Sequence, residues 1–137
     1  MKTIKKKTEF PTETVSKITN TDKPLGKNDT YARWDVGTID DLQALLRIRA
    51  CEGDNRQNDS PSIDEFIEIL TPFKDKVTLI GYVIYPPRND ARISVEGFEI
   101  TDVTPDELLN LLEECGQPDE FDKKKIGEKY NARFWWD

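Results

Sequence analysis

Carboxylates are the most numerous charged groups in this sequence, and they gather in its second half. Residues 93–122 hold ten Asp and Glu side chains and no Lys or Arg. Two facing carboxylates can hydrolyse a glycosidic bond when burial raises the pKa of one of them. Here the acids fall on expected turns and on the polar side of a helix, in a chain of only 137 residues. We therefore expect these carboxylates to bind rather than to catalyse.

The sequence contains no other complete motif for catalysis or metal binding. The chain has no histidine, which excludes Ser-His-Asp and Cys-His nucleophilic sites. The loop after Asp54 starts like a calcium-binding loop, but Arg56 replaces a ligand at the third position and the sixth is not glycine. Cys51 and Cys115 lie 64 positions apart with no metal-ligand cluster, and we expect reduced, half-buried thiols, a disulfide being the alternative. The sequence thus predicts no enzyme activity, no metal and no cofactor.

The helix expected at 105–115 carries the first candidate site. Thr104 is placed to cap it, and Glu107 completes a capping box. Leucines mark its buried side, so the acids opposite them face solvent and repel one another. One interpretation is a surface that docks on a basic protein with electrostatic steering; the other is a solvated face that maintains solubility. The residues expected to dock are Glu107, Asn110, Glu113 and Glu114.

An aromatic strand expected at 130–136 carries the second candidate site. Alternation places one aromatic set toward the core and leaves Trp135 on the other face, beside Arg133. The first strand of the domain would add Tyr31 and Arg33 to the same face if the two strands were neighbours. This group of four side chains is the second set that we expect to contact a partner.

Three interpretations of that sheet face stay open. Aromatic and Arg side chains are equally suited to ordinary packing, to a protein interface, and to the stacking of single-stranded bases. The strand expected at 92–100 lacks the basic-Gly-aromatic pattern of RNA-binding sheets. The acidic body also repels phosphate, which makes nucleic acid the least favoured of the three.

Hydrophobic periodicity and turn signals place the other elements. Gly37 ends the first strand and Thr38 is placed to cap the helix after it, while Ser62 and Glu65 form a capping box for the next helix. The apolar parity slips at Gly97, which predicts a β-bulge there. An acidic loop followed by three lysines leads to the last strand. We expect strands at 30–36, 77–85, 92–100 and 130–136, and helices at 39–50, 63–70 and 105–115.

This order predicts an α+β fold with a four-stranded antiparallel sheet and helices packed on one face. It matches the ferredoxin-like β-α-β-β-α-β order when the first two helices share one crossover. That arrangement places the strand from Val77 to Tyr85 at an edge, although it is the most apolar strand and edges normally carry charge or proline. Either something covers that edge or the strand order differs. Pairing of two copies through this edge would make the chain a homodimeric structural subunit.

Charge divides the chain into two parts. Residues 1–28 hold seven Lys and three acids, whereas residues 29–137 hold 13 Lys and Arg and 24 acids, within a net charge of −7. The first part has few apolar residues and no period, so we expect a basic flexible arm followed by a single acidic domain. The arm, with Lys2 and the lysine run at 5–7, is a second candidate site for contact with nucleic acid.

The function expected from these features is binding. The lysines at the start precede no apolar stretch, and the longest apolar run is too short to cross a bilayer, so we expect a cytoplasmic protein without membrane contact. By size and charge we expect a non-enzymatic, acidic protein-binding module. Inhibitors or immunity proteins of phages and mobile elements, which dock on a basic nucleic-acid-processing protein, share this profile. The alternatives are a nucleic-acid-associated module and a homodimeric subunit.

Overall fold

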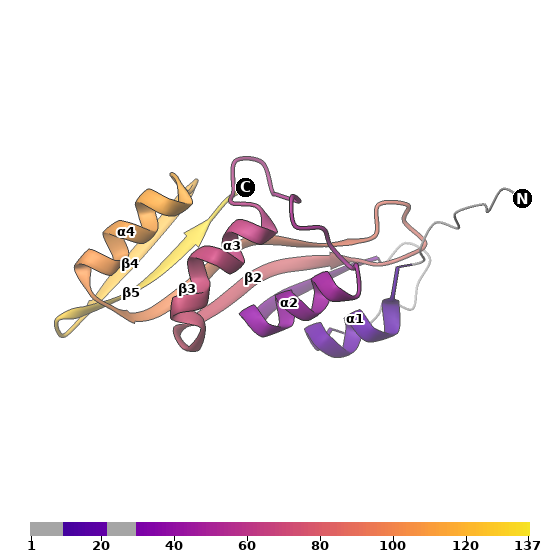
Figure 1. Ribbon diagram of the computed structural model, residues 1–137, viewed down its shortest axis with the longest axis horizontal. Helices are drawn as coiled ribbons and strands as arrows, with labels where there is room; N and C mark the ends of the chain where they lie inside the picture. Colours follow the sequence, from indigo (N-terminus) through magenta and orange to yellow (C-terminus); the bar gives the residue numbers. More distant parts are fainter. Residues whose placement is uncertain (1–9, 22–29) are drawn as a thin grey trace, which may run out of the picture.

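The structure, a computed structural model, describes residues 10–21 and 30–137. Within these residues the chain is elongated, with helices in one layer and an open antiparallel sheet in the other (Figure 1). The α+β class is therefore confirmed. The elements are α1 (Thr12–Thr19), β1 (Tyr31–Gly37), α2 (Ile39–Arg47), α3 (Ile63–Leu70), the 3-10 helix η1 (Thr71–Lys76), β2 (Val77–Ile84), β3 (Arg92–Val103), α4 (Pro105–Cys115), β4 (Glu120–Ile126) and β5 (Lys129–Trp135).

The sheet differs from the predicted one in strand number and strand order. In the described residues it has five strands in the order β1-β2-β3-β5-β4, and every neighbouring pair is antiparallel. The expectation of four strands in a ferredoxin-like order is wrong. Two hairpins, β2–β3 and β4–β5, join through β3 and β5, and β1 is added beside β2 by the crossover through α2 and α3.

The position of β2 resolves the conflict noted for the apolar strand. β2 pairs with β1 on one side and with β3 on the other, so its backbone groups face two partners within the chain. Its apolar character follows from this central position, since a central strand has no edge to protect. Consequently, a homodimer that pairs through the Val77 to Tyr85 edge is incompatible with this fold.

The predicted bulge in the β3 strand is confirmed. Ile80 pairs with Gly97 and Gly81 with Val95, which leaves Glu96 without an opposite residue on β2. Such an extra residue bends a strand and turns its side chain to a new direction. The bulge therefore places the carboxylate of Glu96 on the sheet face that the helices leave open.

The lysine run, expected in a connecting loop, forms an additional strand instead. β4 is exposed along nearly its whole length, and Phe121 is its one partly buried apolar residue, packed against Phe134 at 5.0 Å between ring centroids. Ile126 pairs with Lys129, so Gly127 and Glu128 form a two-residue turn, and Gly127 has a φ of +65°. That turn, rather than hydrophobic alternation, is the local signal for this hairpin.

The expected helix starts are confirmed at three helices. Thr38, Ser62 and Thr104 each accept a hydrogen bond from the backbone N–H three residues on, and the acid at that position closes the capping box. The first of these helices ends at Arg47, three residues before the expected end. Each capping box satisfies two N–H groups that an α-helix otherwise leaves unpaired.

Residues 12–19, expected to belong to a flexible arm, form α1. Val15 is fully buried, and the ring of Phe10 meets that of Tyr85 edge to face at 6.2 Å. The Tyr85 hydroxyl also lies 2.5 Å from the Thr21 hydroxyl. Tertiary contacts, rather than periodicity, stabilise so short a helix. The lysines at positions 2 and 5–7 lie outside the described residues.

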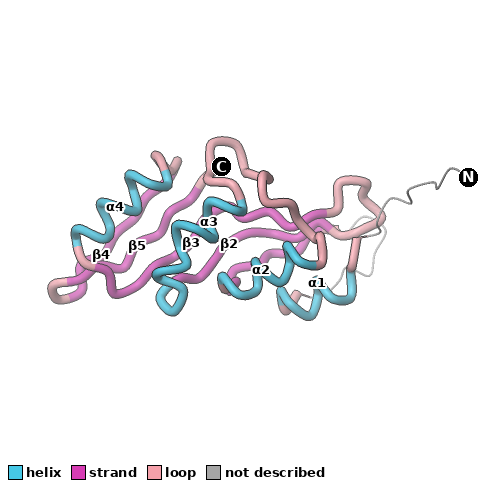
Figure 2. The backbone as a smooth tube through the Cα atoms, in the orientation of Figure 1, coloured by secondary structure: helices cyan, strands magenta, loops and turns pink. Residues whose placement is uncertain are grey.

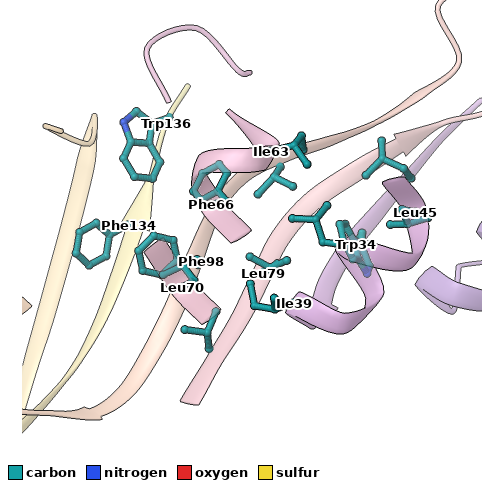
Figure 3. Packing of buried hydrophobic residues seen from close by; sticks show 14 of the residues in the cluster. Trp34, Ile39, Leu45, Ile63, Phe66, Leu70, Leu79, Phe98, Phe134 and Trp136 are labelled. Carbon is teal, nitrogen blue, oxygen red and sulfur yellow. The ribbon is translucent and has the colours of Figure 1, made fainter. Parts of the chain in front are cut away.

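The core lies between the helix layer and the sheet (Figure 2). Near its centre Phe66 of α3 meets Phe98 of β3 and Trp136 edge to face, at 6.2 and 5.8 Å between ring centroids. Phe98 stacks on Phe134 at 4.5 Å, and these rings point toward one another from α3, β3 and the β5 end of the chain (Figure 3). This aromatic cluster fixes α3 over the middle of the sheet. At the other end, Trp34 packs beneath α2.

Candidate protein-docking surfaces

A groove runs between α3 and α4 on the outer side of the helix layer. It has a volume of about 660 Å³ and continues along η1. Four of its lining side chains are glutamates and none is Lys or Arg, while its floor is apolar. We call it the acidic groove; its lining residues are Glu65, Glu68, Ile69, Pro72, Phe73, Glu107, Asn110, Leu111 and Glu114.

Two of the four glutamates in the acidic groove also cap helices. Glu65 accepts from the backbone N–H of Ser62 at 3.1 Å, and Glu107 from that of Thr104 at 2.9 Å. These backbone hydrogen bonds hold the pKa of each carboxyl below its usual range. Arg56 pairs with Glu65 at 3.2 Å. Both groups are therefore ionised at neutral pH, with one oxygen already engaged.

The other two glutamates have no internal partner. Glu68 and Glu114 are exposed, and within the described residues neither makes a hydrogen bond or an ion pair. Nor does an ion pair connect the lysine run of β4 to α4: Lys123 instead lies over the ring of Tyr130, at 5.4 Å from its centroid. Among the described residues, the carboxylates of Glu68 and Glu114 are thus the two in the acidic groove that no basic side chain neutralises.

The structure divides the four docking residues predicted on α4. Glu107, Asn110 and Glu114 line the acidic groove, whereas Glu113 is exposed but not among the lining residues. The opposite wall, with Glu65 and Glu68, was missed because the sequence does not show that α3 lies beside α4. The polar side of α3 could have indicated a second set of exposed acids. Only the strand order, however, shows that α3 and α4 are neighbours.

The second predicted set comes together on the open face of the sheet. The guanidinium of Arg33 lies 5.5 Å and that of Arg133 4.8 Å from the ring centroid of Trp135. Arg33 also donates to the hydroxyl of Tyr31 at 3.1 Å. The expectation that these two strands are neighbours was wrong, because β2 and β3 lie between β1 and β5. The long Arg33 side chain nevertheless reaches Trp135 across the sheet face.

The arginines of this cluster are engaged internally. Arg33 donates to Glu96 at 2.7 Å and to Asp35 at 2.8 Å. Burial alone would lower the pKa of Arg33, but its hydrogen bonds to Tyr31, Asp35 and Glu96 outweigh burial and raise it. Arg133 lies 3.8 Å from Glu99 and 3.9 Å from Glu120. Each cation is thus already beside carboxylates, which weakens its attraction for a phosphate group.

Glu96 is the residue of this cluster that sequence reasoning missed as a functional or structural partner. Its side chain is 12% exposed, against 38% for Arg33. We expect a double-mutant cycle of Glu96→Gln and Arg33→Met to give a coupling free energy of about 1 kcal/mol, reduced from the buried-pair range by the exposure of Arg33. Urea denaturation of the four proteins measures it.

The ion pair of Arg88 and Asp90 provides the control for this cycle. It is as short, at 2.6 Å, but both side chains are 48% exposed. We expect its coupling to be smaller than that of Arg33 and Glu96, because solvent screens both of its charges. Equal coupling for the two pairs would contradict a structural role for the bulged Glu96.

Both thiols are buried and free. Burial, with added repulsion from Asp64, raises the pKa of Cys51 to about 12, and burial with repulsion from Glu114 and Glu65 does the same for Cys115. At pH 8 we expect thiol reagents to modify the folded protein at least about 100-fold more slowly than the urea-unfolded protein, because almost no thiolate forms. Rapid modification of either folded thiol would show that its burial is wrong.

Comparisons with protein-family models, with curated proteins and with solved structures find no match for this chain. Among the described residues, no three or more Asp, Glu, Cys or His side chains cluster as a metal site would require. In the same residues no helix combines the length and the apolar character needed to cross a membrane.

Proposed function

We propose that this protein is a non-enzymatic binding module whose acidic groove docks on a positively charged protein. The observation that carries the proposal is a groove with four glutamates and no lining cation, two of whose carboxylates have no partner in the described residues. Such a surface raises the rate of encounter with a basic partner and is completed by its cations. The class of partner we propose is a basic, nucleic-acid-processing protein that the module inhibits, as an immunity protein does.

The test compares two variants of the full chain as immobilised baits. Glu68→Gln/Glu114→Gln removes the two unpaired charges of the acidic groove without touching a capping box, and Glu113→Gln removes one charge from α4 outside the groove. We expect the wild type and Glu113→Gln to capture the same basic protein, with binding lost at high salt and in the double variant.

Two results would count against the proposal. Capture that is equal for the wild type and the double variant would show that the acidic groove is not the docking surface. A captured protein whose nucleic-acid-processing activity is unchanged by a molar excess of the chain would remove the inhibitor role. The nucleic-acid alternative has no new support, because its lysine arm lies outside the described residues and the sheet-face arginines are paired.

A further inference from the structure

We infer that the occupant of the acidic groove is an amphipathic basic helix, carrying two cations seven positions apart on the same side as an apolar residue between them. This inference rests on the proposed function and specifies how the partner is recognised. It is argued from the spacing of the groove walls, from the apolar floor and from the charge of the rim.

The wall formed by α4 has helical spacing. Glu107, Asn110, Leu111 and Glu114 line it, at positions i, i+3, i+4 and i+7 of one helix. The two glutamates are therefore separated by seven residues, which is about 10 Å along a helix axis. Between them lie a polar amide and a buried leucine. The wall thus presents negative charge at both ends and, between them, a polar amide in front of the buried leucine.

The wall formed by α3 and η1 carries Glu65 and Glu68 on α3 and apolar residues on η1. α3 runs antiparallel to α4 (Figure 1), so the start of one helix lies beside the end of the other. Glu65 and Glu114 therefore share one end of the groove. In agreement with this, burial is the main cause that raises the pKa of the Cys115 thiol, and both carboxylates raise it further. Ile69 and Phe73 continue the apolar floor begun by Leu111.

The spacing of the charges distinguishes a helix from an extended strand. On a helix, residues seven positions apart point in nearly the same direction and are separated by about 10 Å, which matches the α4 wall. On an extended strand, residues on one side recur about every 7 Å, so the separations available are about 7 and 13 Å. The helical spacing therefore matches the separation of the two glutamates along α4 more closely than either strand spacing does.

The apolar floor determines the residue between the two cations. A leucine or methionine three or four positions after the first cation would contact Leu111 and Ile69, as in other complexes where an amphipathic helix enters a groove. The aliphatic stems of Lys or Arg can also cover the apolar walls while their charged ends reach the rim. Charge and apolar surface thus select the same helical pattern.

Three peptides of identical composition, added to the full chain, test the inference. The first is an alanine-based helix of about 15 residues with Lys at i and i+7 and Leu at i+3 and i+4. The second places the second Lys at i+5, on another side of the helix. Each peptide contains one proline, placed at the first position in the first two peptides. The third keeps the Lys and Leu positions of the first but has its proline at the centre, where it prevents a continuous helix. Calorimetry measures affinity, and circular dichroism measures helix formation.

The expected result is that the first peptide binds at least about tenfold more tightly than the other two and gains helix on binding. Its affinity should fall about tenfold in Glu68→Gln/Glu114→Gln and little in Glu113→Gln. Equal affinity for all three peptides, lost in the double variant, would overturn the helical mode and leave the acidic groove as a docking surface. Affinities that the double variant does not change would overturn the docking surface itself.

Discussion

Replacing Phe98 with alanine is expected to lower the free energy of unfolding by about 3–5 kcal/mol, the largest effect of any single substitution proposed for this chain. Phe98 is fully buried, and its ring contacts three other aromatic rings: it stacks on Phe134 at 4.5 Å, meets Phe66 at 6.2 Å and lies 6.4 Å from Trp136. Removing it leaves a cavity where the sheet and α3 meet, and both ring packing and apolar burial are lost.

Denaturant unfolding monitored by tryptophan fluorescence measures this loss, with Phe121→Ala as the matched control. Phe121 packs on Phe134 from the edge strand β4 and is only partly buried, so its truncation removes less buried area. We expect the control to cost less than half as much. If the two variants lost equal stability, the aromatic cluster would not be the centre of the core.

Gly97→Ala is expected to cost about 3 kcal/mol, at the upper end for an overpacked site. A Cβ built at this position would lie 2.0 Å from the carbonyl oxygen of Phe134 and 3.1 Å from the Cα of Trp135. Both are backbone atoms of the neighbouring strand, which cannot rotate away as a side chain would. The β3 and β5 strands would have to separate beside the bulge, and the contact of Trp135 with Arg33 would be disturbed.

Gly127→Asn is the control, because no atom lies within 4 Å of a Cβ at that turn and its φ of +65° is one that asparagine tolerates. We expect its stability to stay within about 0.5 kcal/mol of the wild type. Near-ultraviolet circular dichroism should change in Gly97→Ala alone, because tryptophan lies beside that glycine. An unchanged spectrum and an unchanged unfolding midpoint in Gly97→Ala would contradict the close approach of the two strands.

The parts of the fold that sequence analysis predicted correctly depend on neighbours in the sequence. Thr38, Ser62 and Thr104 cap their helices as predicted, the last two with the predicted capping boxes, and the parity slip at Gly97 marks the bulge. The strand order depends on contacts between distant segments, which no local pattern encodes. The apolar character of β2 did indicate that an edge position was unsuitable, and its central position explains that character.

The missed elements are those whose stability comes from tertiary contacts. α1 has too few apolar residues for a periodic signal, and Val15 and Phe10 stabilise it only through their contacts with the rest of the domain. For the candidate site, the α4 wall of the acidic groove was predicted from helical spacing. Its α3 wall was not, because Glu68 becomes a groove residue only when the sheet places α3 beside α4.

The two outer strands of the sheet, β4 and β1, disfavour the addition of further strands from other copies of the chain. β4 carries Lys123, Lys124 and Lys125 along its exposed length, and β1 has an irregular register between Trp34 and Gly37. A second copy that paired its own β4 with this β4 would bring its lysines against these, and the irregular β1 does not offer a regular ladder for stacking. The chain therefore carries, at both margins of its sheet, protection against growing into a fibril.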